Sequence, residues 1–138
     1  MMNKIKPIKQ ITKFADLLEE IVDYIDKING VDGDELIFTL RNGRKFKLFH
    51  EQACCERVYI EDIDGNIYDL IGNTLIQCEE VSSYKEDIDK ASELYVPDED
   101  SYKWTFYKMA TIRGHVTIRW YGSSNGYYSE SVDFKEIL

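Results

Sequence analysis

Residues 11–28, ITKFADLLEEIVDYIDKI, carry the most regular apolar pattern of the chain. Apolar side chains recur three and four positions apart over about five helical turns, which is the period of an α-helix with one buried face. Asn29-Gly30 follows, and both residues tolerate the left-handed conformation at a helix end. The segment therefore predicts one long amphipathic helix. Its apolar face would consist of Ile11, Phe14, Leu17, Leu18, Ile21, Val22, Ile25 and Ile28.

The rest of the chain predicts strands on which that helix can pack. Asn42-Gly43 separates two alternating segments, 35–41 and 44–50, and favours a hairpin whose two turn residues both have positive φ. Further strands are expected at residues 57–63, 74–81, 102–112, 115–121 and 127–134, with the last three forming a meander. The expected fold class is α+β: one long N-terminal amphipathic helix packed on a mostly antiparallel sheet of about six strands.

The length of 138 residues is typical of a single domain. Within it we expect a loose arm at 1–10, the helix at 11–28, the hairpin and strands at 35–81, an acidic loop at 82–101 and the meander at 102–134. A hydrophobic content of 43% excludes the class of disordered chains. The apolar runs are too short to cross a membrane and no secretory signal is visible, so we expect a cytoplasmic protein without membrane contact.

Charge is distributed unevenly along the chain. The net charge is −9, and residues 79–100 hold nine acidic side chains against two lysines. Residues 103–126 hold lysines and arginines and no acidic side chain. We therefore expect any anion-binding surface to include the second segment.

The spacing of histidines and cysteines disfavours a metal site and thiol catalysis. Structural zinc sites use two spaced ligand pairs, which do not occur here. Three cysteines are an odd number, and adjacent cysteines rarely bond to each other, so reduced thiols are expected. There is also no Gly-rich phosphate loop and no catalytic signature. We expect no metal, no cofactor and no enzymatic activity, with a thiol or nucleotide hydrolase as the alternative. The residues weighed are His50, Cys54, Cys55, Cys78 and His115.

The acid-free segment contains the most suggestive group of side chains. Strand alternation places Arg119 and Tyr121 on one face and Ile118 and Trp120 on the other. Arginine pairs with phosphate through two hydrogen bonds, and aromatic rings stack on bases. A nucleotide-sized ligand would suit this surface. The alternative is an ordinary sheet in which aromatic residues pair across strands for stability.

Four runs in the chain resemble a family of small phage and prophage proteins known as a domain of unknown function. They are HEQACCE at 50–56, YIEDIDG at 59–65, WTFY at 104–107 and IRWYGSSNGYYS at 118–129. The resemblance extends from about residue 35 to the C-terminus. The chain is also similar to the first class of Thoeris anti-defence proteins, which bind a cyclic ADP-ribose isomer without cleaving it.

The resemblance implies a phage-encoded anti-defence protein in the cytoplasm of an infected bacterial cell. It would sequester a cyclic nucleotide or cyclic ADP-ribose-type immune signal, act as a homo-oligomer and bind no nucleic acid directly. Arginines would hold the phosphates and aromatic side chains the adenine. The ligand-binding residues we nominate are Arg57, Arg119, Tyr121, Asn125 and Tyr127, with Arg113 and Phe106 as second choices.

Two other functions stay open at this point. The acidic segment 79–100 could mimic nucleic acid, so that the protein inhibits a host nuclease or CRISPR effector by protein–protein contact. Alternatively, the chain could be a phage accessory protein with no catalytic role.

Overall fold

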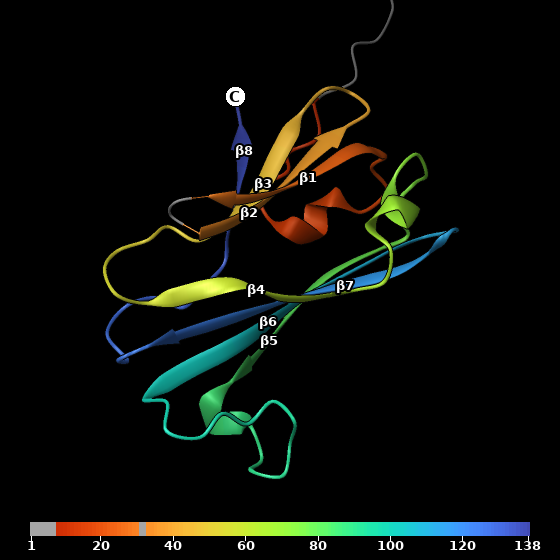
Figure 1. Ribbon diagram of the computed structural model, residues 1–138. Helices are drawn as coiled ribbons and strands as arrows, with labels where there is room; N and C mark the ends of the chain where they lie inside the picture. Colours follow the sequence, from red (N-terminus) through yellow and green to blue (C-terminus); the bar gives the residue numbers. More distant parts are fainter. Residues whose placement is uncertain (1–7, 31–32) are drawn as a thin grey trace, which may run out of the picture.

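In a computed structural model, which describes residues 8–30 and 33–138, the chain forms two antiparallel sheets that face each other (Figure 1). Sheet I has the strand order β1-β2-β3-β8, and sheet II has the order β4-β7-β6-β5. The strands are β1 (Val22–Gly30), β2 (Gly33–Leu40), β3 (Lys45–Phe49), β4 (Arg57–Asp64), β5 (Gln77–Tyr84), β6 (Ser101–Thr111), β7 (Gly114–Ser124) and β8 (Asp133–Ile137). Three short 3-10 helices complete the described part: η1 (Phe14–Leu17), η2 (Ile67–Leu70) and η3 (Lys85–Asp87).

The prediction of a long N-terminal helix, and with it the α+β class, is wrong. The segment 11–28 forms η1 and then β1. Ile11, Phe14 and Leu17 are spaced by three, the period of a 3-10 helix, and all three are buried. The helical path ends at Glu19, whose φ of 74° is left-handed and whose N–H donates to the Leu75 carbonyl oxygen.

A β-bulge explains why β1 imitates a helical period. Val22 lies opposite Leu40 and Ile25 lies opposite Phe38, so both face the core although three positions separate them. The bulge between Val22 and Tyr24 adds one residue to β1 and thereby turns a spacing of two into a spacing of three.

The hairpin at Asn42-Gly43 is confirmed, because β2 pairs with β3 on either side of it. Its turn differs from the expected type, since of the two turn residues only Gly43 has a positive φ, 91°. Asn42 contributes differently: its side-chain oxygen accepts a hydrogen bond from the Arg44 N–H at 3.0 Å.

The predicted C-terminal meander is wrong at its last strand. β6 and β7 pair as expected, but β8 joins sheet I beside β3. The reason is that β7 already has β4 on one side and β6 on the other, so it offers no free edge. β3 has a free edge, and the chain must cross to the other sheet to reach it.

The main core lies between the sheets, with η1 inserted into it (Figure 1). The ring of Phe14 packs edge-on against Tyr107 with ring centroids 4.7 Å apart. Trp120 of β7 points into the same core and is 1% exposed. The described residues include no helix that is long and apolar enough to span a membrane.

The acidic segment forms a structured excursion, defined here as residues 85–100, at the lower end of the view in Figure 1. It packs on the outer face of sheet II, where Tyr102, Trp104 and Tyr121 form a second apolar cluster. The excursion contributes Ile88, Leu94 and Val96 to this cluster. Acidic side chains of the excursion thus remain in solvent, while its apolar side chains cover an aromatic surface.

Candidate ligand-binding site

Two connections between the sheets run side by side at one edge of the molecule. Residues 50–56 lead from β3 to β4, and residues 125–132 lead back from β7 to β8. The His50 ring nitrogen Nδ1 lies 2.7 Å from the Ser131 carbonyl oxygen, and the Glu51 N–H donates to the Asp133 carboxylate at 2.9 Å. These contacts join the two crossovers and fix the residues that follow each of them.

The carboxylate of Glu56 organises the first crossover. It accepts hydrogen bonds from the backbone N–H groups of Ala53 at 2.6 Å and Cys54 at 3.1 Å, and lies 3.0 Å from His50 Nε2. The Ala53 N–H and then His50 lower the pKa of the Glu56 carboxyl from 4.5 to about 2. Both ring nitrogens of His50 thus lie within hydrogen-bond distance of an oxygen atom.

The cysteines have two different roles. The expectation that adjacent cysteines stay reduced is wrong, because the sulfur atoms of Cys54 and Cys55 are bonded to each other. Cys78 is a free, buried thiol whose Sγ donates to the Phe14 carbonyl oxygen at 3.2 Å. Burial raises the pKa of the Cys78 thiol to about 12, so it stays protonated and serves packing.

A pocket of about 290 Å³ opens where the first crossover meets the end of β7 and the end of the excursion. It combines one cation, three carboxylates, two hydroxyls, an amide and a phenol ring. Its lining residues are Cys55, Glu56, Arg57, Glu99, Asp100, Ser123, Ser124, Asn125 and Tyr128. We call it the crossover pocket.

Arg57 is the distinctive residue of the crossover pocket. Its guanidinium carbon lies 5.4 Å from the ring centroid of Tyr59. Within residues 8–30 and 33–138, its side chain makes no hydrogen bond or ion pair. Each of the other four arginines has a carboxylate within 4.0 Å; the pairs are Arg41–Asp23, Arg44–Glu136, Arg113–Asp69 and Arg119–Glu61.

The turn after β7 supplies the polar wall of the pocket. The Asn125 side-chain oxygen accepts the Tyr127 N–H at 3.0 Å, which leaves the amide NH₂ group for another partner. The Ser124 hydroxyl is already engaged, since it donates to Glu130 at 2.8 Å and accepts the Gly126 N–H at 2.9 Å. Tyr127 itself is 84% exposed and packs edge-on against Tyr128 beside the pocket.

The remaining nominated residues lie outside the pocket lining. Tyr121 is 7% exposed because the excursion covers it, and Arg119 is paired with Glu61. Phe106 lies directly opposite Arg119 on the outer face of sheet II. Arg113 belongs to the turn between β6 and β7, at the other end of sheet II. The predicted alternation is confirmed, because Ile118 and Trp120 are in the main core.

Glu99, Asp100 and Tyr128 line the pocket although they were not among the residues nominated from the sequence. Their positions come from the way the excursion folds back toward β6 and the second crossover turns away from β7. Proximity in sequence to Asn125 could have suggested Tyr128, but no local signal associates the excursion with Arg57.

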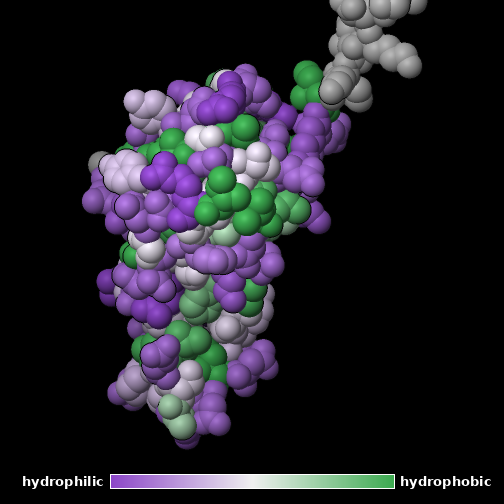
Figure 2. Space-filling view, turned by 90° about the vertical axis from the view of Figure 1, so that its right-hand side faces the viewer, coloured by the Kyte–Doolittle hydropathy of each residue, from purple (hydrophilic) through white to green (hydrophobic). Residues whose placement is uncertain are grey.

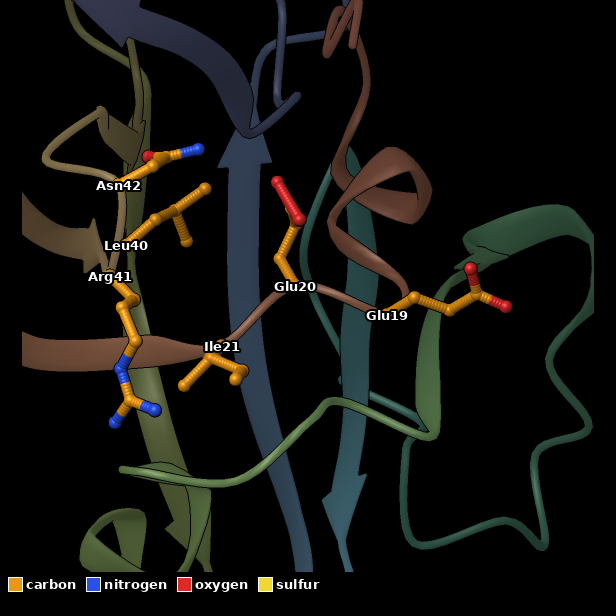
Figure 3. A pocket seen from close by; sticks show the side chains of 6 residues that line it. All are labelled: Glu19, Glu20, Ile21, Leu40, Arg41 and Asn42. Atoms are coloured by element: carbon orange, nitrogen blue, oxygen red, sulfur yellow. The ribbon is translucent and has the colours of Figure 1, made fainter. Parts of the chain in front are cut away.

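Other cavities have fewer converging groups. The one in Figure 3 measures about 270 Å³ and lies between the end of η1 and the β2–β3 turn. Its side chains diverge in the figure, with Glu19 pointing away from Arg41. The right-hand face of Figure 1 is largely hydrophilic, with apolar side chains gathered near its middle (Figure 2). A shallow cavity of about 450 Å³ is lined by partly exposed Leu18 and Ile76, together with Glu19, Thr74 and Leu75.

A family model described as a domain of unknown function, DUF7448, matches residues 5–134. No curated protein and no solved structure matches the chain. Because the match covers nearly the whole chain, the protein belongs to the DUF7448 family.

Proposed function

We propose that this protein is a non-catalytic binding protein that holds a small nucleotide-type ligand in the crossover pocket. In keeping with the resemblance to phage and prophage proteins, its biological role would be to sequester a cyclic ADP-ribose-type immune signal in an infected bacterial cell. The observation that carries the proposal is Arg57, a guanidinium at the pocket that forms no ion pair with any carboxylate of the described chain.

The pocket chemistry supports a nucleotide fragment. A guanidinium binds phosphate through two parallel hydrogen bonds, and its stacking on Tyr59 limits the rotamers it must give up on binding. The free Asn125 amide group can donate to a base edge, and the rings of Tyr127 and Tyr128 offer stacking surfaces. About 290 Å³ is at the lower end of ligand-pocket volumes, so a larger cyclic ligand would extend beyond it and would suit a site shared by two protomers.

Two groups of the pocket that could act as a nucleophile or a base are already engaged. The Cys55 sulfur is bonded to Cys54, and the Glu56 carboxylate already has three donors. Neither is placed to act as a nucleophile or a general base. Sequestration requires affinity and no transition-state stabilisation, so this arrangement supports binding without turnover.

The test is binding of cyclic ADP-ribose isomers, measured as thermal stabilisation and as recovery of intact ligand after heat release and chromatography. Arg57→Ala should weaken binding by about 10- to 100-fold, the range for losing a charge-assisted contact. The matched control is Arg113→Ala, since Arg113 lies far from the pocket and should leave affinity unchanged. A cleaved product, or equal effects of the two substitutions, would refute the proposal.

A second candidate function rests on the excursion. The Trp104 indole N–H donates to the Leu94 carbonyl oxygen at 2.8 Å, and the Val96 N–H donates to the Tyr102 hydroxyl at 3.1 Å. The excursion is therefore held in place while it exposes Glu86, Asp87, Asp89 and Glu93. A fixed acidic surface would suit contact with a basic nucleic-acid-binding site on a nuclease or CRISPR effector.

Neutralising these four carboxylates to their amides separates the two functions. None of them lines the crossover pocket, so ligand binding should persist in the variant. Loss of inhibition of a nuclease by the same variant would support the protein-contact function. Loss of ligand binding would instead count against our placement of the ligand.

A further inference from the structure

Two carboxylates of the excursion, Glu99 and Asp100, line the crossover pocket together with Arg57. The Lys85 ammonium donates to the backbone carbonyl oxygens of both residues, at 2.6 Å for Glu99 and 2.9 Å for Asp100. This double contact fixes the end of the excursion against the start of η3. The backbone of both residues is thus anchored beside the pocket.

The carboxylates themselves are free for a ligand. In the part of the chain that the structure describes, neither the Glu99 nor the Asp100 carboxylate accepts a side-chain hydrogen bond or forms an ion pair. Arg57 lines the same pocket without pairing with them. Opposite charges that share a small cavity without contact leave space for a molecule that bears both an anion and hydrogen-bond donors.

A third polar group, which lies near the pocket but outside its lining, also lacks a partner. The Tyr121 hydroxyl is buried and makes no hydrogen bond, which is unusual for a buried polar atom. Burial, and next the negative charge of Glu99, raises the pKa of Tyr121 to about 12. Tyr121 precedes the pocket residue Ser123 by two positions in β7, so both side chains lie on the same face of sheet II.

From these three observations we infer that the crossover pocket selects ribonucleotides, binding the phosphate through Arg57 and the ribose 2′- and 3′-hydroxyls through Glu99 and Asp100. The inference rests on the proposed function and adds the ligand class to it. Carboxylates are the usual acceptors for ribose hydroxyls, which donate two hydrogen bonds from adjacent carbons. Phosphate alone would gain from Arg57 but be repelled by the carboxylates, so a free anion should bind poorly.

The sugar should therefore decide affinity. A ligand that lacks one hydroxyl leaves a pocket carboxylate without its donor, and sites built to bind a hydroxyl reject such analogues strongly. We expect 2′-deoxy-AMP and 3′-deoxy-AMP to bind at least about 10-fold more weakly than AMP. Inorganic phosphate should bind more weakly than either of them.

The experiment is isothermal titration of the full chain with AMP, its two deoxy analogues, inorganic phosphate and cyclic ADP-ribose. Glu99→Gln and Asp100→Asn should each reduce the preference for AMP over 2′-deoxy-AMP. The control is Asp98→Asn, because Asp98 is the exposed neighbour outside the pocket lining and asparagine tolerates its φ of 65°. Melting temperatures of all variants establish that they are folded.

The outcomes separate this inference from the proposed function. A clear ribose preference that the Glu99 and Asp100 variants abolish supports both. If cyclic ADP-ribose binds in an Arg57-dependent way but AMP and the deoxy analogues do not differ, ribose selection is overturned and the proposed function stands. If no nucleotide binds, both are overturned.

Discussion

Replacing Leu17 by alanine tests the fold directly, because the adjacent Leu18 provides an internal comparison. Leu17 ends η1 and is 0% exposed between the sheets, whereas Leu18 is 39% exposed at the surface. In a continuous helix over residues 11–28 both leucines would lie on the apolar face, and their truncation would cost similar free energies. The observed fold predicts very different costs.

The magnitude follows from burial. Removing the side chain of a fully buried leucine costs the transfer free energy plus the cavity term, together about 3 kcal/mol. For a domain of this size that lowers the melting temperature by about 10 °C. Leu18→Ala, at a partly exposed site, should cost less than about 1 kcal/mol. The difference exceeds the error of a urea titration.

The assay is urea unfolding followed by tryptophan fluorescence, with linear extrapolation for each variant. With a slope of about 1.5 kcal/mol per molar urea, Leu17→Ala should lower the midpoint by about 2 M and Leu18→Ala by well under 1 M. Equal losses for the two variants would show that Leu17 and Leu18 share one buried face and would refute the 3-10 helix followed by a strand.

Three further predictions concern single contacts. The pKa of the Glu56 carboxyl is lowered from 4.5 to about 2, so its contribution to stability is complete above about pH 4.5 and is lost as the pH falls toward 2. Glu56→Gln should flatten this acid dependence of the urea midpoint, whereas the control Glu51→Gln should not. Gly65 and Gly72 both have positive φ, but an added side chain would overlap the His115 carbonyl oxygen at Gly65 and would meet open space at Gly72. Gly65→Ala should therefore lower the melting temperature clearly more than the matched control Gly72→Ala. Trp104→Phe removes the hydrogen bond that anchors the excursion at Leu94, so tryptic cleavage at Lys90 within the excursion should become faster. The control Trp120→Phe removes no hydrogen bond, and equally fast cleavage in both variants would contradict the anchoring role of Trp104.

Local sequence patterns predicted the strands better than their partners. The alternation in β7 correctly assigned Ile118 and Trp120 to the core, and Asn42-Gly43 correctly predicted a hairpin. Both results depend on neighbouring residues alone. The destination of β8 depends on which strand edges are still free, and that is known only once sheet II is complete.

The candidate site divides in the same way. Arg57, Asn125 and Tyr127 were nominated from residue type and position, and the structure places the first two in the pocket lining and the third beside it. Arg119 matched the same chemical criteria but is paired with Glu61, which a bulge in β4 brings next to it. Residue type cannot distinguish a free arginine from a paired one.

By itself, the sequence determined where strands alternate, where one hairpin turns and that acidic charge is concentrated in one segment. These properties arise from residues within a few positions of each other, so one sequence suffices to specify them. Only the tertiary structure decided that residues 11–28 form a short 3-10 helix and a strand, because the bulge opposite Leu40 gives a strand the spacing of a helix. Only the tertiary structure brought Glu99 and Asp100 to Arg57, because that proximity depends on an excursion packing its apolar side chains onto an aromatic sheet face.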